Sequence, residues 1–485
     1  MTDAIRMRGA TMAAGQDRLW VVAYLATTGV VLLVMMLAGL WLRLTQAGWL
    51  YTDPALFYQI MTVHGTGMVG IAALGGAAVM WHFLSAHIRL NAWVMGVNLA
   101  LFLAGVLAIL SADFLGGFGA GWTFLYPLPA QSQGAWPVWA AVLHLGGLLV
   151  IGVGFLLWCL ELARGIITAY GGLGRGLGWH VLFGGSTDRV PPPTVVAATM
   201  VVIVNTLALV SGAAVLVMSL VNIFFPAVEI DALLAKNLIY FFGHVFINAT
   251  IYMGVTAVYE LLPRITGRPW KTSKVFLAAW TTSTVMVLII FPHHLLMDFA
   301  MPVWTMAIGQ VFSYVNSFPV LVVTGLGALA IAHRSGIRWD LVSTLLLISM
   351  FGWMAGVVPA VIDATIMVNS VMHNTMWVPG HFHFYLLLGL LPMIFAVMVH
   401  LARGGDVTPR GSDRLARLYL LFGLGFVAMF LMGGWASVPR RWAVHMAEWM
   451  IWDRLASVMA VGVIALAGAF VAMFLMRLRG MLREG

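Results

Sequence analysis

Long apolar stretches separated by short polar segments run through the whole 485-residue chain. Each stretch holds about the 20 residues that a helix needs to cross the hydrocarbon core of a bilayer, where unpaired backbone groups are too costly. The pattern therefore predicts an all-α integral membrane protein with about twelve transmembrane helices. We expect these helices over residues 18–43, 55–84, 91–111, 136–163, 194–225, 236–262, 274–292, 302–332, 340–362, 375–402, 415–437 and 449–477.

The composition agrees with a bilayer location, since 62% of the residues are hydrophobic and only 9% are charged. A soluble globular domain normally carries about 25% charged residues. No polar stretch is long enough for a separate soluble domain, so residues 1–485 are expected to form a single membrane-embedded domain. The largest interruption is the Gly-rich segment 165–193, which is predicted to be a loop.

Positive charge is distributed unevenly between alternate loops. Loops 112–135 and 363–374 contain no Lys or Arg. Basic residues instead gather in segments 1–18, 164–189, 264–274, 334–338, 403–417 and 477–483. Because basic loops stay in the cytoplasm, an even number of helices places both termini there. This bias accounts for most of the net charge of +8, so no nucleic-acid partner is expected. Arg440 and Arg441 are the exception, because they lie in an outer loop.

Histidines cluster on one side of the predicted membrane. Ionisable groups at membrane depth are costly and usually functional, so a one-sided cluster is informative. The single cysteine, Cys159, leaves no Cys-based metal site, and any metal is therefore expected to be held mainly by histidine. The histidines in the outer half of the helices or in outer loops are His64, His144, His244, His293, His294, His373, His381, His383 and His445.

The tenth predicted helix carries the sequence His381-Phe382-His383. Residues two apart on an α-helix point about 200° from each other, so these histidines cannot share a metal but can each bind a different one. A helix between two haems needs that geometry. His64, at a similar depth in the second helix, is a candidate for the second axial ligand of the haem that His383 binds, and the adjacent Gly65 would let a macrocycle approach the backbone.

A second group of histidines lies near the outer ends of the sixth and seventh helices. His293 and His294 follow a helix-breaking proline, Pro292, and His244 follows Gly243. Adjacent histidines beside such a break can converge on one ion, and His244 would complete a three-nitrogen site. That site suits copper, although imidazole also binds iron or zinc.

Taken together, these motifs resemble subunit I of the haem-copper oxidase superfamily over essentially the whole chain. The segment from His373-Asn374-Thr375 to His381-Phe382-His383 is similar to the B-type branch. The resemblance implies a haem-copper oxidase subunit I bundle with two haems of b or a type and a distal copper, with iron the weaker alternative. It implies these roles: a bis-His low-spin haem on His64 and His383, a mono-His high-spin haem on His381, the distal metal on His244, His293 and His294, and a haem-binding surface at Trp122, His373, Asn374, Arg440 and Arg441.

The sequence departs from the family at one catalytic position. Oxygen reductases of this family usually carry a tyrosine four residues after the helix-6 histidine, covalently linked to it, whereas this chain has Asn248 there. The i to i+4 spacing keeps Asn248 on the same face as His244. A phenol can supply an electron and a proton when dioxygen is split, and an amide cannot. The chain thus resembles a copper-containing nitric oxide reductase variant, with the catalytic set His244, Asn248, His293, His294 and His381.

Alternatives stay open at this point. A proton-translocating cytochrome c oxidase subunit I that reduces dioxygen would need a tyrosine from elsewhere, such as Tyr252 or Tyr314. Distal iron would call for a nearby glutamate, but Glu260 is about 24 Å along the helix from His244, which favours copper. Outside this class, a membrane transporter would also have about twelve helices, and a haem-bearing electron-transfer or assembly subunit would need no distal metal.

The resemblance also implies partners and a location. Electrons are expected from the outer side, through a smaller membrane-anchored subunit that carries a dinuclear copper or haem centre. Cytochrome c or a similar protein would supply electrons to that subunit. The chain itself is expected to be a multi-pass protein of the bacterial inner (cell) membrane, in contact with the lipid bilayer.

Overall fold

The computed structural model describes residues 2–185, 189–405, 409 and 411–483, and in this part of the chain the regular structure is helical. Of the basic residues behind the orientation, Arg410 and the side chains of Arg6, Arg8 and Arg483 lie outside what is described. The helices are α1 Thr2–Gln46, α2 Pro54–Leu84, α3 Trp93–Leu115, α4 Val138–Tyr170, α5 Leu173–Gly176, α6 Trp179–Leu182, α7 Pro193–Phe224, α8 Ala232–Gly254, α9 Thr256–Thr266, α10 Lys274–Ile289, η1 Phe291–Leu295, α11 Val303–Val320, η2 Leu321–Leu326, α12 Gly327–Ala332, α13 Leu341–Asp363, α14 Ile366–Met372, α15 Trp377–His383, η3 Phe384–Leu390, α16 Leu391–Ala402, α17 Asp413–Trp435, α18 Met450–Leu475 and α19 Leu478–Arg483.

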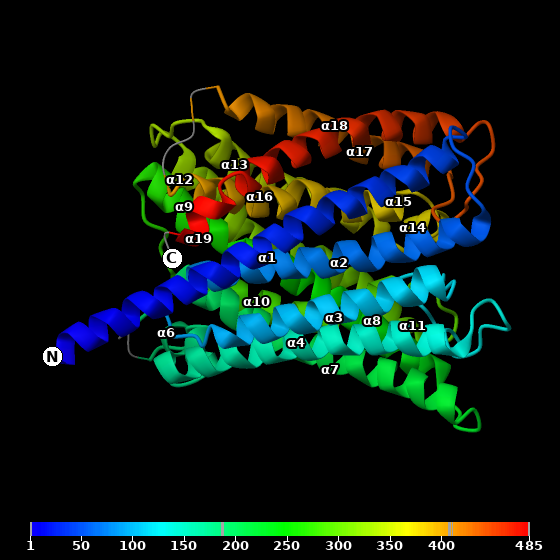
Figure 1. The fold of residues 1–485 in the computed structure, drawn as a ribbon, viewed down its shortest axis with the longest axis horizontal. Coiled ribbons are helices and arrows are strands. Elements are labelled where there is room, and N and C mark those ends of the chain that lie inside the picture. Colours follow the sequence, from blue (N-terminus) through cyan, green and yellow to red (C-terminus); the bar gives the residue numbers. More distant parts are fainter. Residues whose placement is uncertain (1, 186–188, 406–408, 410, 484–485) are drawn as a thin grey trace.

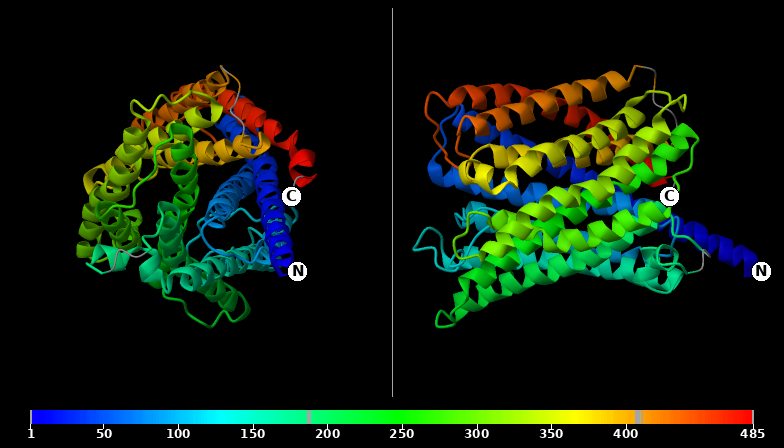
Figure 2. Two further views of the ribbon diagram at one scale, coloured as in Figure 1. Left: turned by 90° about the vertical axis from the view of Figure 1, so that its left-hand side faces the viewer. Right: turned by 180° about the vertical axis from the view of Figure 1, so that it is seen from behind.

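Within the described residues, 12 helices or continuous helix runs are long and apolar enough to cross a membrane. This confirms the predicted all-α membrane fold. The long helices lie roughly side by side along one axis (Figure 1), and the end-on view in Figure 2 shows them gathered into one rounded bundle. The start of α1 and the end of α19 lie at the same end of the bundle, as an even number of spans requires. We call the opposite end the site end.

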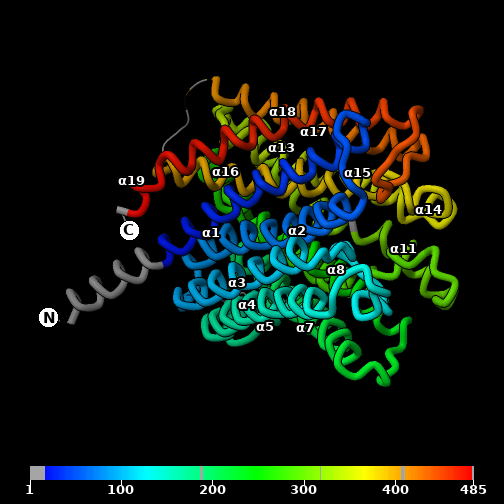
Figure 3. Tube along the Cα trace, turned by 45° about the vertical axis from the view of Figure 1, so that its right-hand side comes forward, coloured from blue at the N-terminus to red at the C-terminus, as the bar shows by residue number. Residues whose placement is uncertain are grey.

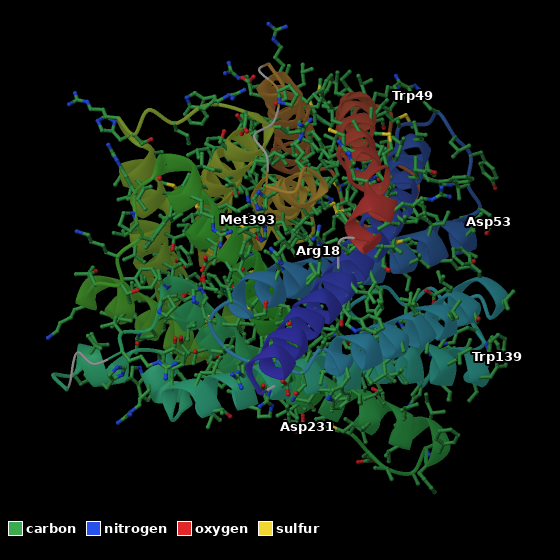
Figure 4. The ribbon with its side chains drawn as sticks, turned by 60° about the vertical axis from the view of Figure 1, so that its left-hand side comes forward. Arg18, Trp49, Asp53, Trp139, Asp231 and Met393 are labelled. Atoms are coloured by element: carbon green, nitrogen blue, oxygen red, sulfur yellow. The ribbon has the colours of Figure 1, made fainter. Side chains whose placement is uncertain are left out.

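Polar caps mark where several helices begin. The carboxylate of Asp53 accepts hydrogen bonds from the first backbone N–H groups of α2, and Asp231 does the same for α8. Asp340 forms a capping box with Ser343 at the start of α13. Such caps satisfy N–H groups that have no partner inside the helix. Figure 4 labels Trp49 and the capping residue Asp53 along the segment that joins α1 to α2.

Four of the predicted spans are interrupted rather than continuous. Span 236–262 consists of α8 and α9, which meet at Val255, and span 274–292 ends in the tighter 3₁₀ turn η1. The prolines explain two of the changes. Pro292 opens η1, and Pro319 precedes the wide π-helical η2, because proline lacks the N–H that an α-helix needs. Span 375–402 passes through a second π-helical segment, η3, directly after His383.

The segment 165–193 is more helical than predicted. Helix α4 continues to Tyr170 and ends at Gly171, which has a left-handed φ of 83°. Two short helices, α5 and α6, follow it. Arg164 and Gly165 suggest the start of a loop in the sequence, but a helix that has left the membrane can continue into water until a glycine allows the turn.

The loop between α17 and α18 is fastened to the start of α15. Thr375 and Pro439 form an isolated β-bridge. The N–H of Met376 donates to Val438 O at 2.8 Å, and the N–H of Arg440 donates to Asn374 O at 3.0 Å. Helices α17 and α18 pack against each other, and α18 also packs against α1 (Figure 3). This arrangement brings Arg440 and Arg441 back over the site end.

Candidate metal centre

A cavity of about 820 Å³ opens within the bundle. Its walls come from α1, α2, α8, α13, α15 and α17, together with η1 and the loops at the site end. Sites for cofactors commonly have volumes of about 300–1,000 Å³. Among its lining residues are seven of the nine histidines predicted for the outer half: His64, His244, His293, His294, His373, His381 and His383.

Three of these histidines converge on one point. Nδ1 of His244 lies 3.2 Å from Nε2 of His294, and the Nε2 atoms of His293 and His294 are 3.0 Å apart. Nitrogens held at about 2.0–2.1 Å around a tetrahedral ion are themselves roughly 3.3 Å apart. One nitrogen from each ring lies within 4.8 Å of the others. The donor set and its spacing therefore fit a single metal ion.

In two of these histidines, the ring nitrogen that faces away from the cluster already has a polar neighbour. The hydroxyl of Ser313 donates to Gly309 O at 2.6 Å, so it accepts from Nδ1–H of His293, which is 2.8 Å away. That bond leaves Nε2 of His293 unprotonated and facing the other two rings. On His244, Nε2 points away from the cluster toward the side chain of Asn248.

In both His64 and His383, Nδ1 contacts a backbone carbonyl. Nδ1 of His64 lies 2.8 Å from Met35 O, and Nδ1 of His383 lies 2.6 Å from Pro379 O. A carbonyl can only accept, so each Nδ1 carries the proton and each Nε2 is free to bind a metal. Both residues line the cavity. An unprotonated Nε2 on each ring is what the predicted role of axial ligand requires.

Glycines make room around His64. A Cβ built on Gly39 of α1 would lie 2.6 Å from Cε1 of His64, and one on Gly65 would lie 2.6 Å from Cδ1 of Trp122. Real Cβ atoms almost never approach so closely. Trp122 also lines the cavity and stacks on Phe382 with ring centroids 6.4 Å apart. The sequence predicted that a macrocycle would approach the backbone at Gly65, where the structure places Trp122, and it gave no reason to select Gly39.

The remaining predicted residues lie over the site end. Arg440, Arg441 and His373 line the cavity, and the side chain of Asn374 accepts from Arg440 at 3.5 Å. Burial, followed by the nearby Arg441, lowers the pKa of Arg440 to about 10. Nε of Arg440 is buried without a hydrogen-bond partner. A guanidinium with an unsatisfied Nε–H beside a second arginine fits the anionic propionates of a haem.

Two of the predicted outer-half histidines do not line the cavity. His144 is fully buried, pairs with Asp113 at 2.8 Å and stacks on Phe118. His445 pairs with Asp453 at 2.6 Å. The other oxygen of Asp453 binds Arg43 at 3.0 Å. These two histidines are structural partners of buried carboxylates.

Replacing Asp453 with asparagine should destabilise the protein by about 3–5 kcal/mol, because it leaves the buried guanidinium of Arg43 without its counter-charge. The measurement is the thermal unfolding midpoint of the purified protein in detergent. The matched control is Asp413→Asn, which breaks the exposed pair with Arg417 and should cost only about 0.3–0.5 kcal/mol. Equal midpoints for the two variants would show that the buried pair contributes no more than the exposed one.

Several residues of the site were not predicted. Tyr240, one turn before His244, lines the cavity and stacks on His294 with ring centroids 5.8 Å apart. Asp363 approaches His381, and its carboxylate lies 3.3 Å from Nδ1 of that ring. Spacing from His244 could have identified Tyr240, because i−4 lies on the same helix face. No local pattern links Asp363 to His381, since they come from different helices.

The residues considered for other chemistries have different surroundings. Tyr252 lines the cavity, but it lies eight residues, about 12 Å, along the helix from His244. Its hydroxyl is 3.2 Å from that of Ser283. Tyr314 bonds Thr365, and Glu260 bonds His87 at 2.7 Å. Neither Tyr314 nor Glu260 is among the residues that line the cavity.

Comparison with known proteins identifies similar chains. The family described as Cytochrome C and Quinol oxidase polypeptide I matches residues 20–471. Cytochrome c oxidase subunit 1 of Synechocystis is 24% identical over 370 residues, covering 72% of this chain and 62% of that relative. Quinol oxidase subunit 1 of Sulfolobus acidocaldarius is 26% identical over 356 residues, covering 68% and 62%. The matches thus span less than two thirds of these relatives.

A solved structure has the same fold. It is a heme-copper terminal oxidase dimer determined by cryo-electron microscopy, with a TM-score of 0.73 and 19% sequence identity. The similarity covers 96% of this chain and 84% of the other. At this identity the match concerns the arrangement of the helices alone.

Proposed function

The chain belongs to the cytochrome c and quinol oxidase polypeptide I family, the subunit I family of haem-copper oxidases, and we propose that it reduces nitric oxide to nitrous oxide. In this proposal, His64 and His383 hold a low-spin haem and His381 holds a high-spin haem. His244, His293 and His294 hold a distal copper. Membership of this family also favours a redox enzyme over the transporter considered earlier.

The observation that carries the choice of substrate is Asn248. Its Nδ2 lies 3.2 Å from Nε2 of His244 and donates to His244 O at 2.9 Å. The amide thus occupies the place beside the ring where an oxygen reductase would have its tyrosine. An amide cannot give up an electron. Joining two NO molecules as nitrous oxide and water needs only two electrons and two protons, so no phenol is required.

The bound haems and copper would supply the electrons and the open coordination positions. The protein's own residues would hold these groups in place and move protons. Ser313 fixes the ring of His293 through the hydrogen bond described above, and the side-chain amide of Asn248 donates to the backbone O of His244. Arg440 and Arg441 would neutralise the propionates at the site end.

A proton route from the opposite end is proposed along α8 to α10. Tyr259 shares a hydrogen bond with Thr324 at 2.5 Å and accepts one from Trp280 at 3.1 Å. Further along, Tyr252 reaches both Ser283 and the cavity. These buried hydroxyls lie in the same group of helices as His244, so they offer donors and acceptors for protons moving toward the site.

Dioxygen reduction is the second candidate, and one observation favours it. The ring of Tyr240 stacks on His294 and lines the cavity, so a phenol is present beside the three histidines. The relatives named above are oxidases. The phenol is one helical turn before His244, however, and next to a different ring from the one that Asn248 faces.

The substrate can be tested on the reduced, metal-loaded protein. We expect NO to be turned over more than about tenfold faster than dioxygen, a difference of ~1.4 kcal/mol in activation free energy. The measurement is nitrous oxide formation and dioxygen consumption under matched concentrations of the same electron donor. Dominant dioxygen consumption with little nitrous oxide would reject the proposal.

Two variants test which residue causes the preference for NO over dioxygen. Asn248→Tyr should lower the ratio of NO turnover to dioxygen turnover, because it places a phenol beside Nε2 of His244. Tyr240→Phe keeps the stacked ring and removes the hydroxyl, so under this proposal it should leave NO turnover within a few fold. A loss of dioxygen turnover in Tyr240→Phe, in a protein that prefers dioxygen, would instead assign the phenol to the second candidate.

We propose that this multi-pass membrane protein works with a smaller membrane-anchored subunit that carries a dinuclear copper or haem centre. Cytochrome c or a similar protein would donate the electrons. The relatives include both cytochrome c and quinol oxidases by name, so a quinol is the alternative donor. The single cysteine of this chain supports an external donor centre, since it cannot itself build a dinuclear copper site.

A further inference from the structure

The candidate haem ligands differ in what supports them. His64 and His383 each face a neutral backbone carbonyl through Nδ1. Nδ1 of His381 instead lies 3.3 Å from Oδ2 of Asp363, the last residue of α13. The contact lies within ion-pair distance but does not meet the geometry of a hydrogen bond, and Nδ1 has no hydrogen-bond partner. Contacts in active sites often tighten only when the site is loaded.

The carboxylate is held so that one oxygen faces His381. The side-chain amide of Asn369 donates to Asp363 O at 2.7 Å and to Oδ1 at 3.2 Å. Oδ2 is therefore the oxygen left for the histidine. The next turn is also fixed from α11, because Oε1 of Gln310 accepts from the N–H of Ile366 at 2.8 Å. Asp363 and His381 are 12% and 18% exposed, so water screens their interaction only partly.

Asp363 also interacts electrostatically with Arg440 and His373 at the site end. Burial lowers the pKa values of both groups, and the charge of Asp363 partly offsets that effect. Both of those groups, and Asp363 itself, line the same cavity as His381. Asp363 is thus a fixed negative charge beside the candidate haem ligand.

We propose that Asp363 is a positioning residue for His381: it accepts the Nδ1 proton, fixes the ring with Nε2 toward the haem, and makes the imidazole a stronger donor. Hydrogen bonds to a charged acceptor are roughly twice as strong as those to a neutral one. A carboxylate behind a ligating histidine raises its basicity. A more basic ligand and a nearby negative charge both stabilise the oxidised haem, so Asp363 lowers the reduction potential of the haem on His381 relative to one backed by a carbonyl.

The test uses the complete, haem-loaded protein and does not depend on turnover. Asp363→Asn keeps the size and removes the charge. We expect its high-spin haem to be reduced about tenfold more favourably, ~59 mV higher for a one-electron couple. The readouts are the midpoint potential from a spectroelectrochemical titration and the iron–histidine stretching frequency from resonance Raman spectroscopy, which should fall. Asp363→Glu should lie closer to the parent protein than Asp363→Asn does.

The control for charge alone is Asp53→Asn. Asp53 is an exposed carboxylate at the site end that caps α2, and asparagine caps equally well. It should change neither readout. If Asp363→Asn does not assemble, Asp363→Ser supplies a neutral acceptor for the same comparison. Unchanged potential and unchanged frequency in the assembled neutral variant would overturn the inference.

This inference rests on the proposed role of His381 as the ligand of the high-spin haem, and not on the choice between NO and dioxygen. The variant His381→Ala tests the ligand assignment separately from the inference about Asp363. If that variant keeps its high-spin haem unchanged, the ligand assignment fails and the inference about Asp363 fails with it. If His381→Ala loses that haem while Asp363→Asn changes nothing, the ligand assignment stands and only the inference is wrong.

Discussion

Replacing His294 with alanine is expected to remove the distal metal and leave the haems bound. Nε2 of His294 is the nitrogen that approaches both other rings, at 3.0 Å from His293 and 3.2 Å from His244. Mutation of a residue that only supports a metal ligand typically lowers metal affinity or activity by about 10–100-fold. Loss of a ligand itself should therefore lower turnover by more than ~100-fold. Copper measured by elemental analysis should fall to background, and the low-spin haem spectrum should persist.

The control for this variant is His333→Ala. His333 is exposed and lies just after α12, and it is not among the residues that line the cavity. It should keep both its copper and its turnover. Full copper content in His294→Ala would place the metal elsewhere. Loss of haem together with copper would show that the cluster is needed for assembly of the whole site.

Replacing His383 with alanine should give the second large effect, the loss of the low-spin haem. Nδ1 of His383 is held by Pro379 O, so Nε2 is the ring nitrogen left to bind a haem in the cavity. Haem content should fall by about half, and the spectrum of a six-coordinate low-spin haem should disappear. Steady-state turnover should drop by more than ~100-fold, because electrons lose their route to the second haem.

His64→Ala should reproduce this loss, and the double variant should be no worse than either single one, since both side chains act on one group. His144→Ala is the control for damage to the buried interior. It removes a fully buried histidine that lies outside the cavity, so it should lower stability but keep both haems. Retention of the low-spin spectrum in His383→Ala would contradict the ligand assignment.

The fold and the location of the site could be predicted largely from local patterns. Apolar length alone predicts the spans, because a helix must be long enough to cross the bilayer whatever it packs against. The two-residue spacing of His381 and His383 and the Pro292-His293-His294 sequence are likewise local, and the structure brings all four histidines to one cavity. Their roles as ligands remain predictions that metal analysis and spectroscopy must test.

What the sequence did not predict depends on contacts between distant segments. Asp363 meets His381 across two helices, and Asp453 joins Arg43 to His445 from opposite ends of the chain. Such pairs have no spacing rule. The same limit explains His144, which has the depth expected of a ligand but is paired with Asp113 instead. The interruption at Val255, which has no proline beside it, also depends on how neighbouring helices pack, since tertiary contacts can stabilise irregular turns.

The close approach of the His64 ring to Gly39 restricts which substitutions are tolerated at position 39. Every missense change at codon 39 adds a Cβ, and that atom would lie 2.6 Å from Cε1 of the ring. Gly146, by comparison, has open space around the same atom. A histidine on α2 thereby limits which residues α1 can carry at position 39, in addition to the hydrogen bond that the same ring donates to Met35 O of α1.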